Sequence, residues 1–149
     1  MSDDILAYSL ARHPAPHREK VGLAALFYGL FAAPIVWAGD LMINFALVDH
    51  ACFPGDLPLR HPIAGFGFVW PLVLAIRLVA LVLIASGIYV AYRNWRVTGP
   101  SEGHHHQLIE RGEGRTRFLG IVGVSFGTMF FVIVAAEAIT LAMVPMCSY

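Results

Sequence analysis

The chain has 149 residues, of which 58% are hydrophobic and only 13% are charged, and its formal net charge is zero. Because a soluble domain has about 25% charged residues, this composition indicates an integral membrane protein. The zero net charge and the lack of a basic patch with interleaved aromatic residues argue against a nucleic-acid-binding protein.

Residues 1–21 precede the first apolar stretch and predict a short amphipathic helix followed by a break. Ser2 is a suitable N-cap, and the stretch 13–17, with its two prolines, ends the helix. One side of it can be lined by Ile5, Leu6, Tyr8 and Leu10. Two interpretations remain open: a mobile tail, or a helix that lies on the membrane surface or on a partner subunit.

Residues 22–48 form the first predicted membrane span. A helix of this length covers roughly 40 Å, which exceeds the hydrocarbon core of a bilayer at about 30 Å. At about 100° per residue, Gly29, Ala33, Asp40 and Asn44 fall within about 60° of one another. We expect this stripe to face other helices, because small residues let backbones approach and polar residues avoid lipid.

The rest of the chain predicts two further spans and therefore an all-α membrane fold. An irregular loop at 49–62 leads to a second span at 63–92, and a polar connection at 93–117 leads to a third span at 118–144 and a tail at 145–149. These lengths leave no room for an additional soluble domain.

Three glycines on the first half of the third span predict a close helix contact. Gly123 and Gly127 form a GxxxG pattern, which Gly120 extends backward. In an apolar helix this pattern marks a contact either within the molecule or with a partner protein.

The distribution of basic residues predicts the orientation of the chain. The first connection holds only Arg60, and the closing tail holds none. The other basic residues outside the spans lie in the N-terminal segment and the second connection: Arg12, Arg18, Lys20, Arg93, Arg96, Arg111, Arg115 and Arg117. By the positive-inside rule we expect a cytoplasmic N-terminus and a periplasmic C-terminus, in the inner membrane of a bacterium.

The two cysteines, Cys52 and Cys147, follow the first and third spans. Since both of these spans run outward in the predicted orientation, both thiols are expected at the oxidising outer surface, where a disulfide persists. The alternative is two unrelated thiols that share a face. We expect the disulfide, because position and compartment agree.

One ionisable residue interrupts each span: Asp40, Arg77 and Glu137. Arg77 lies near the middle of its span and the two carboxylates roughly 8 Å outward of it. Because helical side chains lean toward the N-terminus of their own helix, all three are expected to converge at one level. The excess carboxylate is then either protonated or paired with a cation on a partner. Three roles remain open: a salt bridge that fixes helix register, a proton or ion relay, and contact with another subunit.

None of the seven histidines lies in a predicted span, which argues against a haem held by two intramembrane histidines. His50, His61 and Cys52 share the outer loop and form an alternative metal site, although their spacing matches no closed zinc pattern. The run His104–His106 is expected to be a solvated turn. Since catalytic and phosphate-binding motifs are also missing, we predict no cofactor, no metal, no small-molecule substrate and no enzymatic activity.

Several features follow one another along the chain from Phe27 onward. They are Trp37 with polar residues late in the first span, Asn-Phe-Ala-Leu-Val…Cys at 44–52, a Gly/His-rich second connection, Gly-Glu-Gly-Arg-Thr-Arg-Phe-Leu at 112–119, and Pro-Met-Cys at 145–147. In this order they resemble small three-span membrane proteins encoded next to bacterial haem–copper terminal oxidase (cytochrome c oxidase) subunits and their assembly factors. The closing segment departs from the adjacent Pro-Cys pair that this group leads us to expect.

The resemblance implies a non-catalytic accessory subunit or assembly partner of a respiratory-chain complex, with other membrane subunits as its partners. It supplies no catalytic residue. The alternative function is a proton-relay or transport element that uses Asp40, Arg77 and Glu137, since intramembrane ionisable residues often mark pathways.

Overall fold

The computed structural model describes residues 21–56, 59–98, 113–144 and 147. The predicted N-terminal helix and the histidine run of the second connection lie outside these residues. Three long α-helices and a short 3-10 turn form the regular structure of the described part: α2 at Leu23–Cys52, η1 at Pro54–Asp56, α3 at Val69–Val97 and α4 at Glu113–Met143. Each α-helix is long and apolar enough to cross a membrane. For the described residues, the predicted all-helical architecture with three helices suited to spanning a membrane is therefore confirmed.

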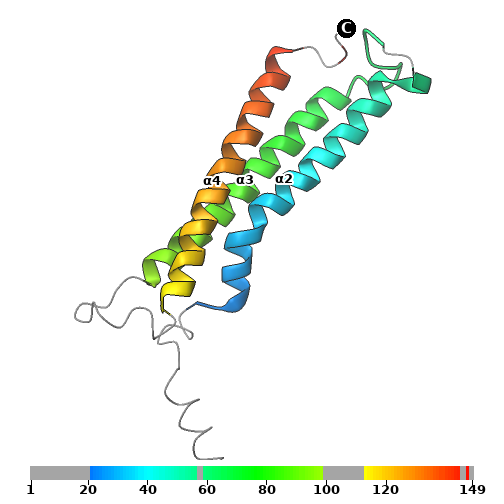
Figure 1. The fold of residues 1–149 in the computed structure, drawn as a ribbon. Coiled ribbons are helices and arrows are strands. Elements are labelled where there is room, and N and C mark those ends of the chain that lie inside the picture. The colour runs from blue at the N-terminus through cyan, green and yellow to red at the C-terminus, as the bar shows by residue number, and fades with distance from the viewer. Residues whose placement is uncertain (1–20, 57–58, 99–112, 145–146, 148–149) are drawn as a thin grey trace, which may run out of the picture.

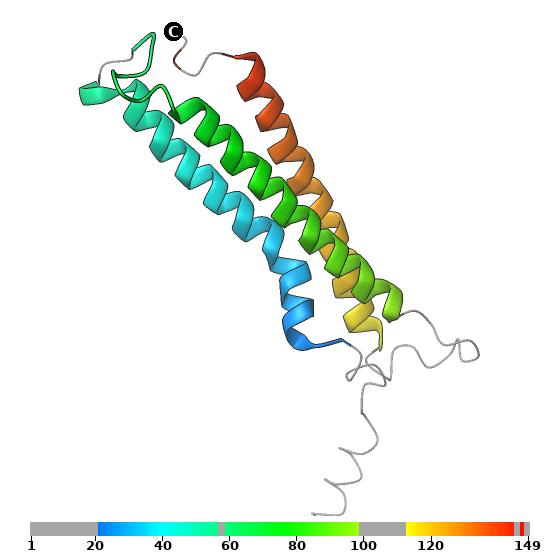
Figure 2. The ribbon, with the colours of Figure 1, turned by 180° about the vertical axis from the view of Figure 1, so that it is seen from behind.

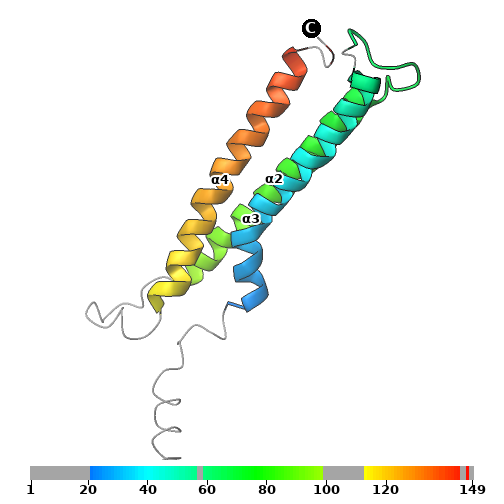
Figure 3. The same cartoon turned by 45° about the vertical axis from the view of Figure 1, so that its right-hand side comes forward.

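The three helices lie side by side, and α3 runs antiparallel to α2 and α4 (Figure 1). Figure 2 shows α2 and α3 alongside each other over most of their length. By contrast, α4 diverges from α2 toward the end of the bundle that holds the C-terminus (Figure 3). We call this the disulfide end, because a bridge between Cys52 and Cys147 lies there. The other end is called the opposite end.

The helices α2 and α4 extend beyond the apolar stretches that predicted them. The end of α2 is at Cys52 rather than at residue 48, and α4 begins at Glu113 rather than at residue 118. The physical reason is that hydropathy marks only the part of a helix suited to hydrocarbon. Backbone hydrogen bonding continues through the polar turns beyond that part.

The start of α3 differs more, because the helix begins at Val69 rather than at residue 63 and continues to Val97. Gly65 has a φ of +95°, a left-handed conformation that a right-handed helix does not contain. A start at Val69 also places Pro71 in the first turn, where its missing N–H has no helical partner.

The helix α2 changes direction within its N-terminal half (Figures 2 and 3). Pro34 lies inside this helix. A proline removes one hydrogen bond of the helical ladder, and its ring clashes with the carbonyl four residues earlier. We attribute the bend to this residue.

One glycine of α2, Gly29, and three glycines of α4 pack within the chain, near the opposite end. A Cβ on Gly123 would lie 2.8 Å from the carbonyl oxygen of Gly29 and 3.0 Å from the Cβ of Ala91. A Cβ on Gly127 would collide with a side-chain carbon of Ile88 in α3 at 2.6 Å, and a Cβ on Gly120 would be in tight contact with the Cα of Trp95 at 3.1 Å. The GxxxG pattern therefore serves an intramolecular contact, one of the two alternatives that the sequence left open.

Two clusters of buried apolar residues hold the helices together: Ala33, Ala80, Ile84 and Val134 toward the opposite end, and Ala51, Cys52, Val69, Val73 and Cys147 at the disulfide end. Asp40, Arg77 and Glu137 lie between these clusters along their respective helices. The fold thus places the three intramembrane charges at one level, with apolar packing above and below.

Candidate functional site

Arg77 of α3 lies between Asp40 of α2 and Glu137 of α4, so each long helix contributes one member. The Nη1 of Arg77 donates a hydrogen bond to Oδ2 of Asp40 at 3.2 Å and another to Oε2 of Glu137. The structure therefore brings together the three ionisable residues that the sequence singled out. We call this set the ion cluster.

Antiparallel packing explains how residues at different depths meet. The two carboxylates start from helices that run toward the disulfide end, and their side chains lean back toward the opposite end. Arg77 starts from a helix that runs the other way, so its side chain leans toward the disulfide end. The long side chains of Arg77 and Glu137 then close the remaining distance.

Asn44 completes the hydrogen bonding of Asp40. It lies one helical turn later on α2, and its Nδ2 donates to Oδ1 of Asp40 at 2.7 Å. Both oxygens of the Asp40 carboxylate thus accept hydrogen bonds, one from Asn44 and one from Arg77. Asp40 and Asn44 are both buried. The predicted stripe of Gly29, Ala33, Asp40 and Asn44 is buried along its whole length.

The two carboxylates of the ion cluster differ in exposure. The side chain of Asp40 is 1% exposed, that of Arg77 is 13% exposed, and that of Glu137 is 30% exposed. Asp40 is therefore enclosed by protein on all sides, whereas Glu137 lies at the border of the bundle. In charge terms, two carboxylates share one guanidinium, so the cluster carries one excess acidic group.

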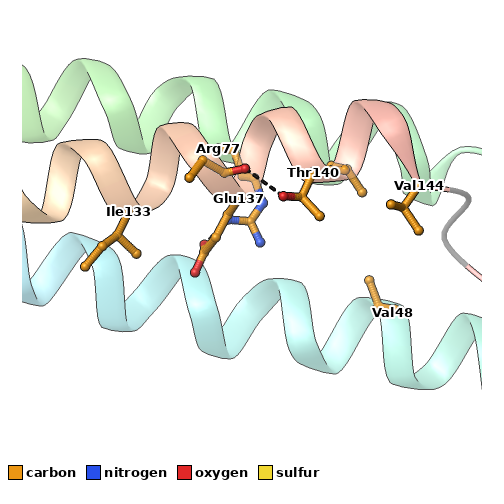
Figure 4. A pocket seen from close by; sticks show the side chains of 8 residues that line it. Val48, Arg77, Ile133, Glu137, Thr140 and Val144 are labelled. Carbon is orange, nitrogen blue, oxygen red and sulfur yellow. Dashed lines mark hydrogen bonds and ion pairs between the residues drawn. The ribbon is translucent and has the colours of Figure 1, made fainter.

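Glu137 opens onto a groove of about 600 Å³ between α4 and α2. The lining residues come from all three helices: Val48, Arg77, Ile133, Ala136, Glu137, Thr140, Leu141 and Val144. In Figure 4 the Arg77 and Glu137 side chains extend into the space between α4 and α2. The wall is otherwise apolar apart from Thr140, whose hydroxyl donates to the carbonyl oxygen of Ala136 at 2.9 Å. We call this space the α2/α4 groove.

The disulfide closes the bundle beyond the groove. Cys52, the last residue of α2, is bonded to Cys147 beyond α4, with 5.5 Å between their Cα atoms. Both residues are buried against Val69 and Val73 of α3. The bridge thus ties the end of α2 to the chain after α4, at the end where these two helices diverge.

The disulfide also removes the thiolate from the alternative metal site. His50 packs its ring on that of Phe66, with 5.5 Å between centroids, and His61 is exposed. Within the described ranges, no group of three or more His, Cys, Asp or Glu side chains could hold a metal ion.

Asn94 is a buried polar residue that the sequence interpretation missed. Its Nδ2 donates to the carbonyl oxygen of Ala25 at 3.1 Å and so ties α3 to the first turn of α2. A span that ends at residue 92 places Asn94 in the connection. The sequence signal that could have identified Asn94 is its spacing from Gly87 and Ala91, because these intervals put all three residues on one face of a longer helix.

Comparison of the chain with family models, with curated proteins and with solved structures gives no match.

Proposed function

We propose that this protein is a non-catalytic accessory subunit or assembly partner of a larger membrane complex. The resemblance drawn from the sequence points to a respiratory complex of the haem–copper oxidase type. The proposed orientation places the N-terminus in the cytoplasm and the disulfide end at the periplasmic face of a bacterial inner membrane, on the basis of the basic residues.

The observation that supports a structural role is the tight packing between the ion cluster and the opposite end. Next to the cluster, Ala33, Ala80, Ile84 and Val134 are buried against one another. Farther along, a Cβ on Gly123 of α4 would overlap the backbone of Gly29, and a Cβ on Gly29 of α2 would lie only 3.1 Å from the backbone of Ala91 in α3.

The apolar part of this half of the bundle also lacks acidic, basic and histidine side chains. No Asp, Glu, His, Lys or Arg occurs between residues 23 and 39 of α2, 78 and 92 of α3, or 118 and 136 of α4. A relay needs titratable or hydrated steps to both surfaces, so this packing favours a cluster that fixes helix register and assembly.

Native purification with haem spectroscopy tests the proposal. The tagged chain is expressed at its natural level and extracted from its own bacterial membranes in a mild detergent. We expect larger subunits to co-purify and to bring haem absorbance with them. The ratio of haem to tagged chain should not change on dilution. A preparation that holds the folded chain without haem would contradict the respiratory assignment. An unrelated tagged three-span protein is the control for detergent carry-over.

The exposure of Glu137 favours one second candidate, a proton-relay or transport element. Purified chain in liposomes with an internal pH dye tests it. A relay predicts proton flux that is lost in Glu137→Gln and retained in Ile139→Ala, a change at an exposed position of α4 outside the groove lining. Equal dye responses in protein-containing and empty liposomes would eliminate this candidate.

A further inference from the structure

We propose that the α2/α4 groove receives a transmembrane helix of a different protein that carries a lysine or arginine at the level of Glu137. This inference rests on the proposed function and names the surface and the chemistry of the partner.

Charge complementarity is the first argument. Arg77 uses a single nitrogen, Nη1, for both carboxylates, and Asp40 has its other oxygen bonded to Asn44. Of the two carboxylate oxygens of Glu137, only Oε2 has a hydrogen-bond partner among the described residues. The side chain of Glu137 is 30% exposed within the groove. Two carboxylates thus share one guanidinium, and the more exposed of them, Glu137, faces the groove. Since an uncompensated charge in hydrocarbon is costly, a basic side chain on the occupant is the complementary group.

The shape of the groove is the second argument. Its α4 wall is one helical face, because Ile133, Ala136, Glu137, Thr140 and Val144 recur at intervals of three and four residues. The residues on either side of Glu137 on this face, Ala136 and Thr140, are small and exposed. Small residues let a neighbouring helix approach closely, and the apolar residues farther along offer contact area on both sides of the acid.

A second copy of the chain is a poorer occupant. Arg77 is the one basic residue within the predicted membrane part of the described helices, and it is already bonded to two carboxylates. Arg93, Arg96 and Arg117 lie near the opposite end, and Arg60 lies in the loop beyond the end of α2, whereas Glu137 lies within α4. The described residues of a second copy would therefore bring no free cation to this level.

Site-specific photo-crosslinking in native membranes tests the proposal. A photoreactive amino acid is placed at Thr140, which lines the groove, or at Ile139, an adjacent residue that is 57% exposed and does not line it. From Thr140 we expect a crosslink to a transmembrane peptide of another protein, with a Lys or Arg within one turn of the crosslinked residue. From Ile139 we expect crosslinks to lipid only. Crosslinks of Thr140 to lipid or to a second copy would overturn the proposal.

The charge of Glu137 is tested separately. In a Glu137→Gln background the Thr140 crosslink should fall about tenfold or more, as expected when one partner of a desolvated ion pair is removed. Glu137→Lys should abolish it, and exchange of the partner's basic residue for Glu should then restore it. An undiminished crosslink in Glu137→Gln would overturn the proposal. Formation of the Cys52–Cys147 bridge in each variant shows that the bundle has folded.

The two proposals fail in different ways. A crosslink to a basic helix without haem co-purification would contradict the respiratory assignment and retain the docking site. Haem co-purification with Thr140 crosslinked to lipid alone would retain the complex and eliminate this groove as the docking surface.

Discussion

The backbone of Gly123 in α4 lies against that of Gly29 in α2 so closely that a Cβ at position 123 would lie 2.8 Å from the Gly29 carbonyl oxygen. The same pair of helices diverges toward the disulfide end (Figure 3). There the Cys52–Cys147 disulfide links the end of α2 to the segment that follows α4. The helix α4 is therefore fixed to α2 at two separated places. The groove and the exposed carboxylate of Glu137 lie between them.

The glycine contact predicts that Gly123→Ala destabilises the bundle, because the added methyl group meets backbone atoms that cannot move aside. Overpacking of this kind costs about 1–3 kcal/mol. Gly39→Ala is the matched control, since a Cβ at Gly39 meets nothing within 4 Å and alanine favours a helix over glycine. Thermal unfolding in detergent measures both variants. Equal stability of the two would contradict the contact.

The ion cluster predicts an asymmetry between single and triple substitutions. Arg77→Leu leaves two buried acids without their cation and should cost about 3–5 kcal/mol, whereas replacement of Asp40, Arg77 and Glu137 together by leucine should be close to neutral. Arg93→Leu, an exposed change on the same helix, is the control. The measurement is the fraction of chain that remains folded after heating in detergent. A harmless Arg77→Leu would show that the cluster does not hold the helices together.

A triple variant that folds also separates the remaining roles of the cluster. If it folds but no longer assembles with its partners, the cluster serves the interface. If it folds and assembles as well as the native chain, the cluster acts as register-fixing contact alone.

The disulfide predicts one linked peptide containing Cys52 and Cys147 when the membrane-extracted protein is digested and analysed without reductant. The bridge closes a loop with a sequence separation of 95 residues, and the chain-entropy relation gives about 4.7 kcal/mol for a loop of this size. Cys52→Ser and Cys147→Ser should each lower thermal stability, and the double variant should lower it no further than either single one. Full alkylation of both thiols in the untreated protein would contradict the bridge.

The orientation predicts that a phosphatase reporter fused after Tyr149 is active, because this enzyme folds only outside the cytoplasm. A reporter fused after Thr98, at the end of α3, should be inactive. A fluorescent reporter that requires the cytoplasm should give the reverse result at both positions. Reversed activities would overturn the orientation and also the reason for expecting an oxidising environment around the cysteines.

Some of this architecture could be predicted from sequence because the responsible forces are local. A long apolar stretch must satisfy its backbone hydrogen bonds within itself, so three such stretches give three helices. The fixed rise per residue then places Asp40, Arg77 and Glu137 at nearby depths, and it places Cys52 and Cys147 at the same end. The bounds of α3 were harder to predict from sequence. Its start depends on the left-handed conformation of Gly65, and its polar end continues through Asn94 to Val97.

The tertiary structure alone decided how each helix is rotated and where it touches its neighbours. The sequence marked Gly123 and Gly127 as contact residues but left open whether the contact was internal, and the steric fit against Gly29, Ala91 and Ile88 resolved this. In the same way, sequence placed both acids near Arg77 without distinguishing them. In the structure Asp40 is enclosed among the helices, whereas Glu137 lies at an open groove. Sequence could not distinguish them because the rotation and crossing of each helix are set by side chains of all three helices at once.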